Sequence, residues 1–284
     1  MMRLDRTATL YLINPLQRRA DFRSAARIPI LMYHSIAEDT GGAIHPYYQT
    51  VTSPGVFAEQ IRFLRDSGYT TVDLRKAMEL LDSPDWSEKR KYVVITFDDG
   101  FQNFYTDAFP VLNKYGATAT MFLPTSFIGD RPLQFMGQDC LTWGMVVELM
   151  KANITFGSHT VTHRPLWNLS LSELEHEISQ SKETIEDKTG HQIDTFAYPF
   201  AFPETNLRFK RQVREILLKH GYQYAVSTVI GTAKRSDDRF VLKRLPVNSW
   251  DDSKLLRAKV EGGYDWLHLC QFAAKVLKNG AGQP

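Results

Sequence analysis

The side chains that could do chemistry in this chain lie in two short clusters. Thr96-Phe97-Asp98-Asp99-Gly100 follows the apolar run at residues 92–95, and Ser158-His159-Thr160-Val161-Thr162-His163 comes about sixty residues later. The two histidines are four positions apart, so we expect them on one face of a helical turn. One carboxylate with two such histidines makes a facial metal site that leaves positions open for water and substrate. The two clusters together predict a divalent-metal site.

Each cluster alone also has a simpler interpretation. An Asp-Asp-Gly sequence at a strand end is often a solvated turn, and two histidines four residues apart are often a surface or capping pair. However, each cluster comes directly after a strand-like apolar run and before a helical pattern. Two adjacent carboxylates at the end of a buried strand are also costly unless a ligand or partner uses them. The combination favours the metal site.

The same residues carry a resemblance to a known family. T-F-D-D-G followed by S-H-T-V-T-H is similar to the motifs of the polysaccharide deacetylases, the NodB-like carbohydrate esterases, and the resemblance covers about residues 29–247. It implies a distorted (β/α) barrel with about seven parallel strands. It also implies that Asp99, His159 and His163 bind the metal and that Asp98 is the general base. Zn²⁺ is the expected ion, although Co²⁺, Ni²⁺ or Fe²⁺ would suit the same donors.

The third motif of the family is only partly matched. Ala197-Tyr198-Pro199-Phe200 resembles it, and the resemblance implies that the backbone N–H of Phe200 contributes to an oxyanion hole. Ala197, however, stands where the family usually has an arginine that orients the base. Arg244 could supply a replacement charge, or it could be a solvated arginine at a strand end.

The general acid is the second departure from the family pattern. The family usually places a histidine near the carboxyl end of the domain, and residues 243–248 contain none. Met32-Tyr33-His34 instead resembles the first strand of circularly permuted members. The first and last strands of a barrel are neighbours, so a permutation would leave the cleft unchanged. His34 is therefore expected to be the general acid, and a buried structural histidine is the alternative.

Strand-like and helical patterns alternate along most of the chain, which favours an α/β fold with a parallel sheet. The polar residues His34, Asp98-Asp99, His159 and Tyr198-Phe200 each follow a strand-like run. In a parallel barrel those strand ends share one rim, where catalysis occurs. We expect residues 1–27 to form an arm or loose helix, residues 28–250 the barrel, and residues 251–284 a helical extension packed on it.

The bulk properties restrict the possible partners. The 284 residues are 43% hydrophobic and carry a formal net charge of +2, so the chain can bury a large core and gives no reason to expect a nucleic-acid partner. Cys140 and Cys270 are too few for a disulfide framework, which favours a reducing compartment. No secretory signal is visible, so we expect a cytoplasmic protein, with peripheral membrane attachment or unconventional export left open. No apolar stretch approaches the ~20 residues of a membrane span.

The expected function is metal-dependent removal of acetyl groups from N-acetylated sugars of a polysaccharide or glycoconjugate. One alternative is a deacylase of a small amide or O-acyl substrate. The other is a non-catalytic carbohydrate-binding descendant of the fold, which the two departures favour and the intact Asp98, Asp99, His159 and His163 oppose. The oligomeric state is not predicted. Several aromatic residues are candidate platforms for sugar rings or members of the core: Trp143, Trp167, Phe200, Phe202 and Trp250.

Overall fold

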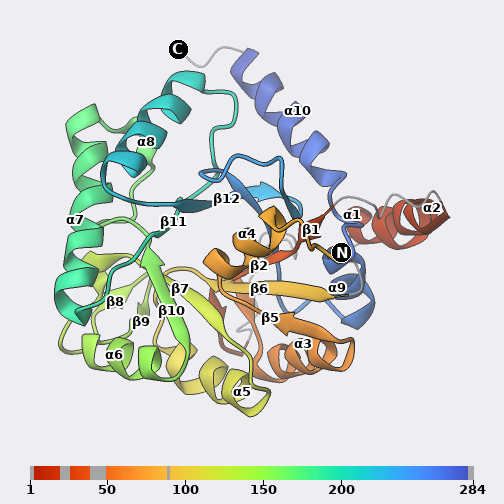
Figure 1. Cartoon of the computed structure of the whole chain (residues 1–284), viewed down its shortest axis with the longest axis horizontal. Coiled ribbons are helices and arrows are strands. Elements are labelled where there is room, and N and C mark those ends of the chain that lie inside the picture. The colour runs from red at the N-terminus through yellow and green to blue at the C-terminus, as the bar shows by residue number, and fades with distance from the viewer. Residues whose placement is uncertain (1–2, 20–25, 39–48, 88–89, 281–284) are drawn as a thin grey trace.

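Seven parallel strands close into a ring at the centre of the computed structural model, which describes residues 3–19, 26–38, 49–87 and 90–280 (Figure 1). In order around the ring they are β2 (Ile30–Tyr33), β14 (Leu242–Pro246), β12 (Tyr224–Ile230), β11 (Thr195–Ala197), β10 (Ile154–Ser158), β7 (Ala119–Leu123) and β6 (Lys91–Phe97). Hydrogen bonds between β6 and β2 close the ring. The distorted (β/α) barrel with about seven parallel strands is confirmed.

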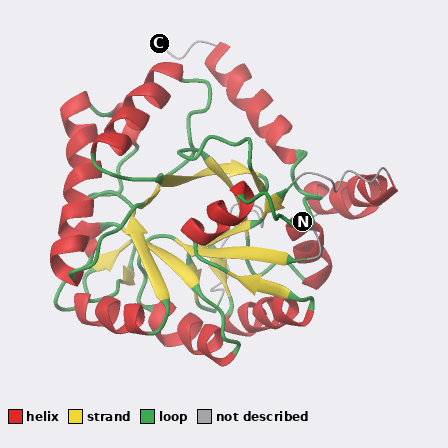
Figure 2. Ribbon diagram, viewed as in Figure 1, coloured by secondary structure: helices red, strands yellow, loops and turns green. Residues whose placement is uncertain are grey.

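The ring strands are short apolar runs because both of their faces are covered. All five residues of β7 are buried, and so are the last five of β6. Helices surround the strands on the outside (Figure 2). The outer helices are α3 (Pro54–Asp66), α5 (Phe109–Lys114), α6 (Trp143–Lys151), α7 (Leu171–Thr189), α8 (Leu207–Lys219), α9 (Ser253–Val260) and α10 (Leu267–Gly280).

Helix α4 (Leu74–Asp82) closes the amino-terminal end of the barrel. Its buried side chains belong to one apolar cluster with inward-facing residues of six ring strands. Ion pairs of Arg75 with Asp194 and of Asp82 with Arg239 join α4 to residues that come just before β11 and β14. With this end closed, the carboxyl ends of the strands form the open rim.

The local sequence signals explain several helix ends. Ser170 and Glu173 form a capping box at the start of α7, and Gly190 ends that helix with a φ of 71°. The segment before Pro110 is a π-helix, η3 (Phe104–Ala108), that passes directly into α5. Pro110 lies in the first turn of α5, where its missing N–H is tolerated.

Shorter strands extend or flank the barrel. β5 (Tyr69–Thr71) adds in parallel to the first half of β6. The remaining pairs are β1 (Arg27–Ile28) with β13 (Ala233–Lys234), β3 (Ser35–Ile36) with β4 (Val51–Thr52), and β8 (Gln134–Phe135) with β9 (Gln138–Asp139). The two 3₁₀ turns described are η4 (Thr125–Phe127) and η5 (Leu166–Asn168).

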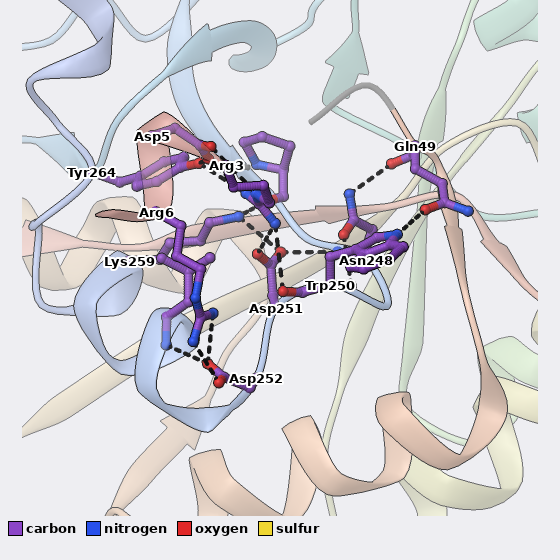
Figure 3. Close-up of polar contacts among 12 residues, drawn as sticks. Arg3, Asp5, Arg6, Gln49, Asn248, Trp250, Asp251, Asp252, Lys259 and Tyr264 are labelled. Carbon is purple, nitrogen blue, oxygen red and sulfur yellow. Dashed lines mark hydrogen bonds and ion pairs between the residues drawn. The ribbon is translucent and has the colours of Figure 1, made fainter. Parts of the chain in front are cut away.

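The amino-terminal residues that the structure describes are helical and contact the carboxyl-terminal helices. They form α1 (Leu4–Ala8), η1 (Thr9–Ile13) and α2 (Asn14–Arg19), and Arg3 and Arg6 pair with Asp251 and Asp252 at the start of the carboxyl-terminal helices (Figure 3). The division into arm, barrel and extension remains a prediction, and residues 1–2, 20–25 and 281–284 of it lie outside the described residues. Among the helices of the described ranges, none has the length and apolar character needed to span a membrane.

Candidate active site

The carboxyl-terminal rim brings together all seven residues that the sequence suggested for the site. They are His34 after β2, Asp98 and Asp99 after β6, His159 and His163 after β10, Phe200 after β11, and Arg244 within β14. Because these strands are neighbours in the ring, residues up to about 200 positions apart in the chain lie together at the rim.

Asp98 is buried against a guanidinium group. Nη1 and Nη2 of Arg244 donate to Oδ1 and Oδ2 of Asp98, each at 2.7 Å, and Arg244 is completely buried. Nε of Arg244 also donates to the carbonyl oxygen of Ser227 at 2.9 Å. Burial raises the pKa of Asp98, but Arg244 and His159 outweigh it, so that this pKa lies below its ordinary value. The alternative of a solvated arginine is wrong: Arg244 brings to Asp98, from another strand, the charge that Ala197 lacks.

His34 lies beside the same carboxylate. Its Nε2 is 3.9 Å from Oδ2 of Asp98, and 18% of its side chain is exposed. Asn103 fixes β3, which follows His34 directly, because its Oδ1 accepts from the N–H of Ile36 at 3.1 Å and its Nδ2 donates to Oγ of Ser35 at 2.7 Å. The imidazole is thus held next to Asp98 and remains accessible from the rim.

Asp99, His159 and His163 converge on one point. Oδ1 of Asp99 lies 3.5 Å from Nε2 of His159 and 3.2 Å from Nε2 of His163, and one donor atom of each of the three residues lies within 4.8 Å of the others. Although buried, Oδ1 of Asp99 has no hydrogen-bond partner among the described residues.

The tautomer of His159 shows that these donors fit a cation. Nδ1 of His159 lies 2.8 Å from the carbonyl oxygen of Ala197, which can only accept, so Nδ1 carries the proton. In the neutral ring, Nε2 therefore directs a lone pair toward Oδ1 of Asp99. Two lone pairs that face each other across 3.5 Å repel, and a shared divalent cation removes that repulsion. Two imidazoles and one carboxylate are donors that suit Zn²⁺ and its neighbours in the first transition series.

The expectation of a helical turn for the two histidines is wrong. Residues 159–165 form an irregular loop between β10 and η5. Thr160 and His163 have φ angles of 73° and 55°, which a right-handed helical turn excludes. Asp99 and Phe200 also have positive φ, so four of the six non-glycine residues with this conformation in the described chain lie at the site. Such strain is typical of functional sites.

Glu177 and Asn103 were not predicted from the sequence. Glu177 is a buried residue of α7 that accepts hydrogen bonds from the N–H groups of Val161 and Thr162. It lies on the same helix face as Leu174 and Ile178, and a charged residue on an apolar face was the signal that could have revealed it. Asn103, close after Asp99, carried no comparable signal.

The aromatic candidates divide into core and rim residues. Trp143 and Phe202 are buried and belong to the core. Tyr198, expected at the rim, is buried too, and its hydroxyl donates to the carbonyl oxygen of Phe240. The exposed aromatics are Phe200, Trp167 and Trp250. The ring centroid of Phe200 is 4.8 Å from that of His163, so Phe200 borders the metal-ligand cluster directly.

Comparisons with known proteins agree with the motifs. A family profile described as polysaccharide deacetylase matches residues 86–225. YxkH of Bacillus subtilis, a protein named as a polysaccharide deacetylase, is 30% identical over 236 residues, which are 83% of this chain and 77% of that protein. The poly-β-1,6-N-acetyl-D-glucosamine N-deacetylase of Escherichia coli is 31% identical over 112 residues, which are 36% of this chain but only 16% of the relative.

Solved structures share the fold over most of the chain. The Streptococcus pyogenes deacetylase PplD, solved in complex with acetate, superposes with a TM-score of 0.71 at 25% identity and covers 84% of this chain and 99% of its own. IcaB from Ammonifex degensii has a TM-score of 0.69 at 22% identity and covers 83% of this chain and 97% of its own. At this identity the similarity is evidence for the fold alone. Taken with the match to YxkH along most of both chains, these findings show that the chain belongs to the polysaccharide deacetylase family of hydrolases.

Proposed function

We propose that this enzyme removes acetyl groups from N-acetylated sugars of a polysaccharide or glycoconjugate and uses a divalent cation held by Asp99, His159 and His163. The observation that supports the proposal most directly is that two groups of residues lie next to each other. The Asp98–Arg244 pair lies next to the three convergent metal donors, and His34 lies 3.9 Å from Asp98. Amide hydrolysis needs a base, an acid and a site for the acyl oxygen, and this cleft offers a residue for each.

Asp98 is the proposed base. A divalent cation at this site would supply Lewis-acid polarisation of the acyl oxygen and would make a water molecule more acidic. Asp98 is ionised at neutral pH because its pKa is lowered, so it can accept the proton of the attacking water. Arg244 engages both carboxylate oxygens and thereby fixes the plane of the base. The departure from the family pattern at Ala197 is compatible with this role because Arg244 orients Asp98 from β14.

His34 and Phe200 act on the substrate in this proposal. The water oxygen forms a bond with the acyl carbon, and the N–H of Phe200 donates to the acyl oxygen as negative charge develops on it. His34 gives a proton to the amide nitrogen while the carbon–nitrogen bond breaks. The products are acetate and a free amine, and the protons taken up by Asp98 and lost by His34 balance.

The substrate class rests on the relatives and on the rim. One relative is named for poly-β-1,6-N-acetyl-D-glucosamine and another, PdaA of Bacillus subtilis, for the N-acetylmuramic acid of peptidoglycan. Both names describe N-acetylated glycans. The exposed ring of Phe200 next to His163 is a surface on which a sugar ring can stack. A small amide or O-acyl compound would need no such surface, so a glycan is favoured.

The test is acetate release from a defined panel: chito-oligomers, monomeric N-acetylglucosamine, a simple acetamide and an O-acetylated glycan. The purified protein is first treated with a chelator and then given Zn²⁺, Co²⁺, Ni²⁺ or Fe²⁺ separately. We expect acetate from the N-acetylated oligomers only after metal is returned. His163→Ala should abolish this recovery, and His191→Ala, which changes an exposed histidine outside the cleft, should not.

Two results would contradict the proposal. Faster turnover of the simple acetamide or the O-acetylated glycan than of the oligomers would favour the small-substrate or O-acyl alternative. No acetate from any substrate, with bound metal demonstrated by elemental analysis, would favour the non-catalytic alternative.

A further inference from the structure

A buried carboxylate lies behind the loop that carries both histidine ligands. Oε2 of Glu177, in the middle of α7, accepts hydrogen bonds from the N–H groups of Val161 and Thr162, both at 2.8 Å. Oε1 of Glu177 accepts from the hydroxyl of Thr162. Only 3% of Glu177 is exposed, and no lysine, arginine or histidine pairs with it among the described residues. A buried charge without a counter-charge is costly, so its hydrogen bonds must compensate for the loss of water.

The backbone of the loop between His159 and His163 needs hydrogen-bond partners. The carbonyl oxygens of Thr160 and Val161 already accept from the N–H groups of Thr125 and Ser126, at 3.1 and 2.9 Å. The N–H groups of Val161 and Thr162 are satisfied by Glu177 instead of by backbone. This arrangement follows from the positive φ of Thr160, which takes the loop out of any regular hydrogen-bonding pattern. Glu177 therefore replaces the ladder that a helix or strand would have provided.

A second contact fixes the start of the same segment. Oγ of Ser181, one helical turn after Glu177, lies 2.5 Å from Oγ of Ser158, the residue before His159. Oγ of Ser158 in turn accepts from the N–H of Thr160 at 3.2 Å. Helix α7 thus holds the loop on both sides of His159, and Glu177 holds it immediately before His163.

We infer that Glu177 is a positioning residue that sets the metal affinity of the site by fixing the loop between His159 and His163. The inference rests on the proposed metal site. This role depends on the length of the Glu177 side chain more than on its charge, because three hydrogen-bond donors of the loop converge on its two carboxylate oxygens. Partners that orient ligands typically change metal affinity by ~10–100-fold when they are removed.

The test is the dissociation constant for Zn²⁺, measured by competition with a chromophoric chelator, together with the absorption spectrum of bound Co²⁺. Glu177→Asp keeps the charge but is one methylene too short, and we expect its dissociation constant to rise by ~10–100-fold with an altered Co²⁺ spectrum. Glu177→Gln keeps the reach: its carbonyl oxygen can accept from both N–H groups, and its NH₂ can donate to the Thr162 hydroxyl. We expect this variant to stay within about threefold of wild type, since all three contacts are retained.

The control is Glu173→Gln, one turn earlier on the same helix. Glu173 is exposed, and glutamine can make the same capping-box contact with the N–H of Ser170, so this change should leave the fold, the metal affinity and the Co²⁺ spectrum unchanged. Should Glu177→Asp not fold, Thr162→Val removes one of the three contacts, and we expect a measurable rise in the dissociation constant. Wild-type affinity in the folded Asp variant, or in Thr162→Val when that variant carries the test, overturns the inference.

The order of the two Glu177 variants is also decisive. If Glu177→Gln loses as much affinity as Glu177→Asp, the charge matters as much as the length of the side chain, and the inference that length decides is wrong. Because these measurements need no turnover, they are separate from the proposed function. A wild type that binds Zn²⁺ but releases no acetate would overturn the function and leave the role of Glu177 intact.

Discussion

Asp98 and Asp251 are both buried carboxylates that accept hydrogen bonds from buried cations, yet their surroundings differ in one respect. Oδ1 of Asp251 accepts from Arg3 at 3.3 Å, and Oδ2 accepts from Lys259 at 2.8 Å and from the N–H of Asn248 at 3.0 Å. Asp5 pairs with the same Arg3, so this cluster contains two acids and two cations (Figure 3). The Asp251 cluster is therefore balanced in charge.

The charges around Asp98 are not balanced. The contacts found for Asp98 and Asp99 in the described chain include one permanent cation, Arg244, and the other partners are histidines. With neutral imidazoles, two carboxylates face one guanidinium, and Glu177 adds a further negative charge behind the loop. A deficit of positive charge around buried acids, and not burial alone, thus distinguishes the place where we propose a divalent cation.

The largest expected effect is on turnover, and it distinguishes the function of Asp98 from that of Asp251. Asp98→Asn removes the proposed base, because an amide cannot take up the proton of water, and we expect kcat to fall by at least ~10³-fold. Zn²⁺ should still bind, since Asp99, His159 and His163 are unchanged. Acetate release and chelator competition measure the two quantities. The control is Asp130→Asn, an acid whose side chain is 85% exposed. A variant that keeps more than a tenth of the wild-type kcat would contradict the assignment of Asp98.

The matching change at Asp251 should act on stability. Asp251→Asn leaves Arg3 and Lys259 buried with one carboxylate fewer, and breaking a buried pair in this way costs about 3 kcal/mol or more. The free energy of unfolding in urea measures the loss. We expect kcat per folded molecule to be unchanged, because the Asp251 cluster supplies no group to the chemistry. Normal stability with reduced turnover would mean that the comparison has the two roles reversed.

A smaller effect tests the geometry of the catalytic pair. Arg244→Lys keeps the positive charge, but an ammonium cannot bind both oxygens of Asp98 in the planar, two-point manner of a guanidinium. We expect kcat to fall by ~10–100-fold, equivalent to about 1.4–2.7 kcal/mol in the activation free energy, with less change in KM. An Arg244→Lys enzyme with wild-type kcat would show that charge alone orients the base.

The group of residues around Asp98 and Asp99 could be predicted from the sequence because its signals are local. Asp98 and Asp99 are adjacent, His159 and His163 are four residues apart, and each group follows an apolar run that folds as a buried strand. The alternation of strands and helices then fixes which strand ends share the rim. What the spacing could not give was the conformation of the loop, since a pair spaced i and i+4 fits a helical turn and a strained loop equally well.

The Asp251 cluster gave no such signal because its partners are far apart in the chain. Arg3 and Asp251 are separated by 248 positions, and an arginine near a terminus resembles any solvated basic residue. The same reason hid Glu177, whose importance depends on a loop that faces it from another element. Arg244 was recognised only as an open alternative, since its pairing with Asp98 depends on barrel closure and not on local pattern.

The smallest expected effect concerns Asp252, the residue next to Asp251. Asp252 pairs with Arg6 at 2.7 Å, but 52% of its side chain is exposed, and its oxygen also caps α9. Asp252→Asn keeps the cap, because asparagine caps helices as well as aspartate does, and removes only the charge. We therefore expect a loss of no more than about 0.5 kcal/mol in the free energy of unfolding, which disappears in ~1 M salt.

The hydrogen bond from Arg6 lowers the pKa of Asp252 despite partial burial. The contribution of this ion pair is therefore present above the unfolded pKa of about 3.9 and is lost as the pH falls through the lower folded pKa. Urea unfolding of wild type and variant should therefore differ at pH 7 and converge below about pH 4. A loss as large as that of Asp251→Asn would show that exposure does not separate weak ion pairs from strong ones in this cluster.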